Sequence, residues 1–186
     1  VDFGGAREHM MWVEKTRRIL RDSGERERKL EKVITNDPYS TEAAARAVKL
    51  AEYYLSRKKY GEAENLLRDT LSQSPDDPQE PAARALLIRV HTCAIPDVST
   101  DVSAYQKVVA EADTFLARFP SVPQADAVRE IRQKAREGAA RALTRVAEFY
   151  ERTRGRNAAL PYWRRLAAEY PDTPQGADAA GKIAPQ

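Results

Sequence analysis

Basic side chains form the densest group of chemically active residues in this sequence. Between Arg129 and Arg165 there are eleven basic residues against four acidic ones, a local balance of +7, although the whole chain of 186 residues carries a net charge of only +3. Guanidinium groups form charge-assisted hydrogen bonds with carboxylates, so this stretch suits an acidic protein partner. No row of aromatic residues accompanies it, which argues against a nucleic acid. A solvated helix face with arginine stems over apolar surface remains the alternative.

Signals of catalysis, of a cofactor and of a metal are missing from the sequence. None of the glycine-rich phosphate loops, GxSxG or HExxH motifs occurs. The carboxylates lie beside basic neighbours on charged helix faces. His9 and His91 are far apart, and neither belongs to a cluster with metal-ligand spacing. Cys93 is the only cysteine and follows an apolar helical stretch, which predicts a buried thiol. We therefore expect no enzyme, no cofactor and no metal site.

Two segments of the chain share one spacing of small and large residues. The first has Ala47, Leu50, Ala51, Tyr54, Ala63, Leu67, Thr70 and Pro75, and the second has Leu143, Val146, Ala147, Tyr150, Ala159, Trp163, Leu166 and Pro171. This is the packing pattern of the tetratricopeptide (TPR) repeat, a unit of about 34 residues. Small residues let two antiparallel helices approach closely, and the proline ends the second helix. The pattern predicts an all-α, TPR-like superhelix of about four helix pairs.

The helices of this solenoid can be placed along a single domain, residues 1–186. We expect a loose end at 1–6, a degenerate first repeat at 7–40, a regular repeat at 41–77, a repeat with an inserted loop at 78–123, a long helix and the last repeat at 124–174, and a tail with little to bury at 175–186. No proline occurs from Gln124 to Thr153, and apolar residues recur there every three or four positions. This predicts one helix of about 30 residues that links the third and fourth pairs and is weakest at Gly138.

Two faces of the predicted solenoid could bind a partner. The C-terminal face would offer Arg152, Arg154, Arg156, Arg164 and Arg165, with Tyr162 as an aromatic anchor. The concave face of the regular repeat would offer Arg46, Lys49, Tyr53 and Arg57. First-helix residues of TPR repeats hold extended or helical peptides, and three of these four are basic, which suits a carboxylate. A solvated helix face remains the alternative for both sets.

Three features together resemble one family of TPR proteins. The insertion Ile95-Pro96-Asp97-Val98 is followed by Asp101, and the long helix runs into Val146-Ala147-Glu148-Phe149-Tyr150 and Arg154-Gly155. The helix terminators are Asn36-Asp37-Pro38-Tyr39-Ser40-Thr41, Ser74-Pro75-Asp76-Asp77-Pro78, Arg118-Phe119-Pro120-Ser121-Val122-Pro123 and Glu169-Tyr170-Pro171-Asp172-Thr173-Pro174. Taken together along the chain, these features resemble the BamD family, the TPR lipoproteins of the outer-membrane β-barrel assembly (BAM) machinery. The resemblance covers about Leu30 to Pro174.

The resemblance implies a non-enzymatic scaffold at the periplasmic face of the outer membrane. Members of the family are held there by a lipid on an N-terminal cysteine, and we expect that cysteine to lie upstream of Val1 or to have been removed. The implied partners are the POTRA domains of a BamA-like barrel subunit at the C-terminal repeats, unfolded outer-membrane proteins at the N-terminal repeats, and other assembly lipoproteins. Three alternatives stay open, namely another TPR adaptor of the bacterial envelope, such as a YbgF-like protein, a generic peptide-binding TPR module, and a structural spacer within a larger complex.

Overall fold

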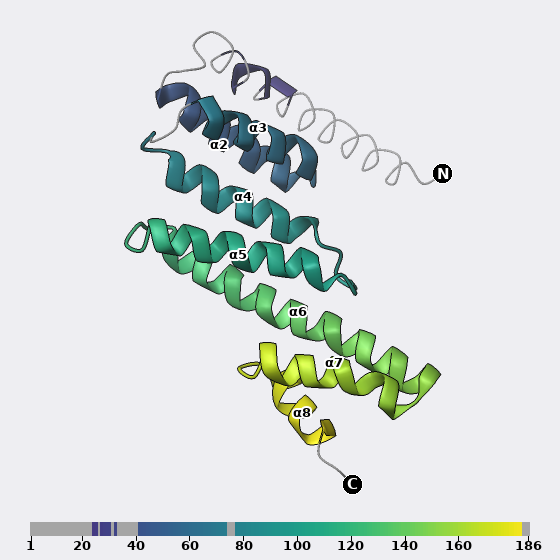
Figure 1. Ribbon diagram of the computed structural model, residues 1–186. Coiled ribbons are helices and arrows are strands. Elements are labelled where there is room, and N and C mark those ends of the chain that lie inside the picture. Colours follow the sequence, from purple (N-terminus) through teal and green to yellow (C-terminus); the bar gives the residue numbers. More distant parts are fainter. Residues whose placement is uncertain (1–23, 26, 31, 33–40, 74–76, 184–186) are drawn as a thin grey trace, which may run out of the picture. The chain divides into compact units, whose positions relative to one another are not determined.

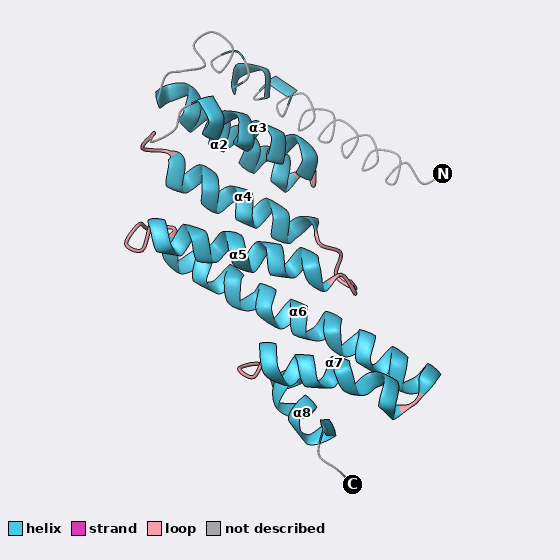
Figure 2. Ribbon diagram, viewed as in Figure 1, coloured by secondary structure: helices cyan, strands magenta, loops and turns pink. Residues whose placement is uncertain are grey.

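The computed structural model describes residues 24–25, 27–30, 32, 41–73 and 77–183. All regular secondary structure in these residues is helical (Figure 2), which confirms the predicted all-α, TPR-like succession of helices. Among them, no helix has the length and apolar composition that crossing a bilayer requires. The chain divides into two compact units, Val1–Glu80 and Pro81–Gln186, which are described separately below. The single-domain organisation stays a prediction.

The first unit contains the regular repeat. Its helices are α2 (Thr41–Ser56) and α3 (Tyr60–Gln73), which pack against each other after a tight turn at residues 57–59. The amide of Lys59 closes this turn by donating to the carbonyl oxygen of Tyr54 at 2.9 Å. The residues at the helix contact are fully or almost fully buried, namely Ala43, Ala44, Ala47, Leu50, Ala51, Ala63 and Leu67. Their burial confirms the register of the first matched repeat. Most of the degenerate first repeat expected at 7–40 lies outside the described residues.

The second unit begins with a helix pair whose connection is the predicted insertion. Its helices are α4 (Glu80–Ala94) and α5 (Val102–Arg118). Asp101 caps α5, because its carboxylate accepts hydrogen bonds from the amides of Ser103 at 3.0 Å and Ala104 at 3.2 Å. The Ser103 hydroxyl and the Ala104 amide lower the pKa of the Asp101 carboxyl below its ordinary value. The last residue of the inserted loop is thus the N-cap of α5.

Helix α6 (Ala125–Arg154) is 30 residues long and confirms the predicted linking helix (Figure 1). Its N-terminal half packs on α5, where Val108, Ala112 and Phe115 meet its residues Val128 and Ala135. Its C-terminal half packs on α7 (Arg156–Glu169). The same helix therefore serves as the second member of one pair and the first member of the next.

Gly138 does not interrupt α6, although the sequence predicts its weakest point there. A Cβ atom at this position would lie 2.4 Å from Cε1 of Tyr105, which is closer than real contacts allow. The missing side chain lets the Tyr105 ring lie directly on the α6 backbone. The packing of that ring offsets the low helix propensity of glycine, so the helix continues through this position.

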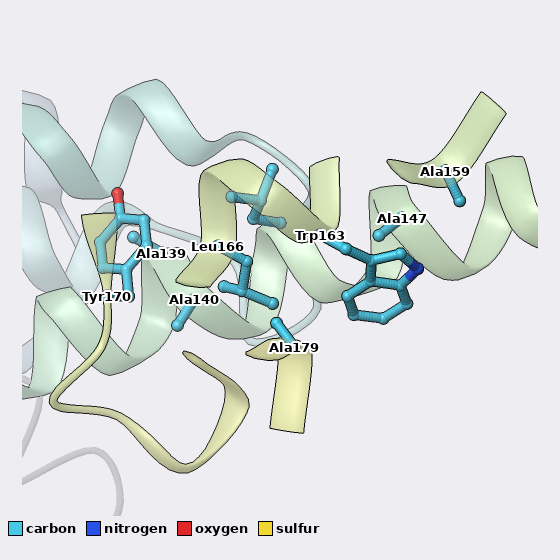
Figure 3. Packing of buried hydrophobic residues seen from close by; sticks show 9 residues of the cluster. Ala139, Ala140, Ala147, Ala159, Trp163, Leu166, Tyr170 and Ala179 are labelled. Carbon is cyan, nitrogen blue, oxygen red and sulfur yellow. The ribbon is translucent and has the colours of Figure 1, made fainter. Parts of the chain in front are cut away.

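The C-terminal core joins α6, α7 and the last helix, α8 (Pro174–Ile183). Trp163 and Leu166 of α7 fill its centre, with Ala140 and Ala147 on α6 and Ala179 on α8 around them (Figure 3). The tail, expected to have little to bury, forms α8, and the residues that this helix buries are the small Gly176 and Ala179. Because Gly176 has no side chain, α8 can lie directly against the backbone of Tyr170 at the end of α7. The helix packs through small residues, and these do not give the pattern of large apolar residues that reveals a buried helix in a sequence.

Candidate protein-binding surfaces

The predicted C-terminal residues flank the turn between α6 and α7. Gly155 alone separates the two helices and has φ 84° and ψ 171°, a backbone conformation that favours glycine. Its amide donates to the carbonyl oxygen of Glu151, and its own carbonyl accepts from the amide of Ala158, both at 3.1 Å. The end of one helix and the start of the next thus meet at one residue.

Most of the basic stretch between Arg129 and Arg165 is neutralised within the second unit. The pairs are Arg129 with Asp126, Arg132 with Asp113, Lys134 with Glu130, Arg136 with Asp172, Arg141 with Glu137, and Arg165 with Glu169. Four of these six acidic partners lie outside the stretch itself, so counting charges along the sequence overestimated its free positive charge. The pairing shifts the available charge toward the α6–α7 turn.

Three of the predicted arginines remain available, two in the last turn of α6 and one in the second half of α7. Arg152, Arg154 and Arg164 are exposed and form no hydrogen bond or ion pair within the described part of the chain. Arg156 instead donates to the carbonyl oxygen of Lys182 at 3.1 Å. Arg165 donates to Oε1 of Glu169 at 2.8 Å, and this bond raises the pKa of Arg165 above its ordinary value. Arg156 and Arg165 therefore already form hydrogen bonds with groups of the same chain.

Tyr162, the predicted aromatic anchor, is half-buried and stacks on Tyr150. The two ring centroids are 4.7 Å apart and the rings are 15° from parallel. The hydrogen bond with Tyr150 raises the pKa of Tyr162 above its ordinary value. The neighbouring Phe149 is 51% exposed and meets the Tyr150 ring edge-on. Its exposed ring makes Phe149 the better anchor at this turn.

The sequence analysis missed Phe149, although a signal was available. Tyr150 takes a packing position of the matched repeat, and adjacent residues of an α-helix point about 100° apart. Phe149 therefore points away from that packing position. We call the set Phe149, Arg152, Arg154 and Arg164 the corner patch.

In the first unit, the structure brings the four concave-face candidates together. Arg46, Lys49 and Tyr53 line an open groove of about 780 Å³. The guanidinium of Arg57 lies 5.8 Å from the centre of the Tyr53 ring. Glu25 and Glu52 also line the groove, and Arg46 pairs with Glu42 at 3.0 Å, so the groove is less positive than the four residues alone indicate.

The described residues contain no group of three or more histidine, cysteine or acidic side chains placed to hold a metal ion. His9 lies outside them. His91 is buried, with Nδ1 2.6 Å from Oε2 of Glu111. The prediction for Cys93 is wrong, because this thiol is exposed. Cys93 lies in the last turn of α4, and the buried residues of that turn are Val90 and His91 instead.

These features define a class of protein: a TPR-like helical scaffold whose exposed features are a basic, aromatic corner and an open groove, both suited to protein partners. The chain belongs to the YfiO family of outer membrane lipoproteins, whose sequence model matches residues 20–182. This is the BamD-type family that the sequence resembles. None of the curated proteins compared with the chain gives a match.

Proposed function

We propose that this protein is a non-enzymatic scaffold of the BAM complex and docks the POTRA domains of a BamA-like barrel subunit through the corner patch. The observation that carries the proposal is a set of exposed arginines without an ion pair among the described residues, Arg152 and Arg154 in the last turn of α6 and Arg164 on α7, with the exposed Phe149 three residues before Arg152. Elsewhere in the basic stretch, carboxylates of the same chain already hold many of the cations. The family match, to an outer membrane lipoprotein, supports the cellular location of this proposal.

The chemistry of the corner patch suits an acidic protein surface with an apolar spot. Arginine forms bidentate bonds with carboxylates, and exposed charges steer encounter and raise the association rate. An aromatic ring beside them supplies apolar area for a central anchor. The rigid Tyr150–Tyr162 stack below Phe149 lowers the entropy lost on binding, because the platform is already ordered.

The groove of the first unit is the second candidate site, and its occupant would be an unfolded outer-membrane protein. Arg46, Lys49 and Tyr53 line it, so an extended segment could place carboxylates on the cations and an apolar side chain on the ring. The full-length protein would then work at the periplasmic face of the outer membrane, held there by its lipid, and contact other assembly lipoproteins as well.

Titration of purified POTRA domains against the chain tests the docking proposal. The test variant carries Arg152→Glu, Arg154→Glu and Arg164→Glu, and the matched control reverses the same number of charges elsewhere on α6, with Arg129→Glu, Lys134→Glu and Arg141→Glu. We expect the test variant to bind more weakly by about tenfold or more, because reversed charges meet an acidic surface. The difference should shrink at high salt, since exposed charges are screened over about 8 Å at physiological ionic strength.

The outcomes separate the parts of the proposal. Equal affinity of the test variant and the wild type would remove the corner patch from the interface. Absence of binding by the wild type at low salt would refute POTRA docking by this chain. Phe149→Ala should weaken binding without changing its salt dependence, because the ring carries no charge.

A further inference from the structure

A second groove lies between α4 and α5 in the second unit, apart from both surfaces above. Its volume is about 350 Å³, near the lower end of the range of about 300–1,000 Å³ found for ligand pockets. Leu87 and Ile88 contribute to it from α4, and Phe115 and Phe119 contribute from the end of α5 and the residue after it. The two phenylalanine rings are 5.3 Å apart. The lining is thus apolar and partly aromatic.

The rim of this groove is basic. Arg84, Lys107 and Arg118 line it, and the one acidic residue in the lining is Glu111. Glu111 is already engaged, because Oε2 lies 2.6 Å from Nδ1 of His91 and Oε1 lies 4.0 Å from Nζ of Lys107. The lining therefore offers an incoming ligand an apolar surface bordered by three cationic side chains and one carboxylate.

We propose that this groove, the α4–α5 groove, binds a linear segment of a partner protein in which a large apolar side chain stands between carboxylates. The apolar side chain would lie on the partly exposed Leu87 and Phe119, above the buried Ile88 and Phe115, and the carboxylates would meet the rim cations. An inorganic anion would leave the aromatic floor unused, and an uncharged apolar molecule would leave the cations unused. A peptide with both features uses all of the lining.

Fluorescence anisotropy with a labelled peptide, Gly-Ser-Glu-Phe-Glu-Leu-Gly-Ser, tests this inference on the whole chain. Two control peptides replace either both glutamates by lysine or the phenylalanine and leucine by serine. We expect saturable binding of the first peptide and a loss of roughly tenfold or more in affinity for each control, because each removes one of the two complementary features.

Variants of the protein locate the bound peptide. Thr114 is exposed on α5 and lines the groove, so Thr114→Trp should fill the space and abolish binding. Ala117→Trp, at an exposed α5 position outside the lining, is its matched control and should bind as the wild type does. Lys107→Glu should weaken binding, whereas Lys134→Glu on α6 should not.

Several outcomes would overturn the inference. One is equal binding of all three peptides, and another is full binding by Thr114→Trp together with loss of binding in Tyr53→Ala, which would place the peptide in the groove of the first unit. Tighter binding of dodecanoate, with displacement of the peptide, would make the occupant an acyl chain. The corner-patch variant should bind the peptide normally, so a failure here leaves the docking proposal to its own test.

Discussion

Glycine at position 138 affects the helix and its packing in opposite directions. Alanine would raise the helix propensity by about 0.5–1 kcal/mol. Its Cβ, however, would lie 2.4 Å from a ring atom of Tyr105, and overpacking of this kind costs about 1–3 kcal/mol. We expect Gly138→Ala to lower the free energy of unfolding by about 1 kcal/mol, measured by urea denaturation. Gly181→Ala, which meets no atom within 4 Å, is the control and should be neutral or slightly stabilising.

The ion pair between Arg136 and Asp172 makes stability depend on pH. Hydrogen bonding to Arg136 lowers the pKa of Asp172 below the ordinary 3.8, so the fold favours the ionised carboxylate. The pair therefore contributes stability above pH 3.8 and loses that contribution as the pH falls through the lowered pKa.

Because half of the Asp172 side chain is exposed, the contribution should be modest. We expect Asp172→Asn to cost about 0.5–1 kcal/mol at pH 7 and progressively less as the pH falls below 3.8 through the lowered pKa of Asp172, measured by urea denaturation across this range. The exposed Asp178→Asn on α8 is the control. A constant difference between wild type and Asp172→Asn at all pH values would contradict the assigned role of the pair.

At the scale of the elements, two alanines hold their helix pairs together. Ala63 and Ala159 are both 0% exposed, each in the second helix of its matched repeat. Leucine in either position would overpack the contact, so we expect Ala63→Leu and Ala159→Leu each to cost about 1–3 kcal/mol. Thermal unfolding followed by circular dichroism measures this. Ala117→Leu and Ala168→Leu change exposed alanines and are the controls, which should keep the melting temperature of the wild type. If Ala63→Leu and Ala159→Leu also kept that melting temperature, the repeat register would be wrong.

The sequence predicts these helices well because their periodicity is local. Each helix from α3 to α7 follows an apolar spacing and ends near proline or glycine in the sequence, whereas α2 ends in a turn in which Lys58 has φ 59°. The α8 packing was missed because it uses Gly176 and Ala179, which carry little hydrophobic signal. The corner patch was predicted only in part, because ion pairs such as Arg132 with Asp113 join residues on different helices. Such partners become visible only after the chain has folded.

At the scale of the molecule, the candidate sites fall in different compact units. The groove with Tyr53 belongs to residues 1–80, whereas the corner patch and the α4–α5 groove belong to residues 81–186. A scaffold that holds several proteins needs such separate sites. Variants in one unit should therefore leave binding at the other unit's sites intact, and the three sets of substitutions above can be combined to check this.

Helix α6 belongs to two helix pairs, so a partner that stabilises one end of this helix can also stabilise the other end. Amide protons in both halves of this helix depend on one continuous ladder of hydrogen bonds, and neighbouring segments often open as one cooperative unit. A partner that binds at the corner patch stabilises the closed form of α6, and with it the α5 residues that pack on the other half. Hydrogen–deuterium exchange with and without POTRA domains should therefore show slower exchange around Val108 and Ala112 as well as around Arg152. Slowing confined to the last turns of α6 would mean that the two ends respond independently.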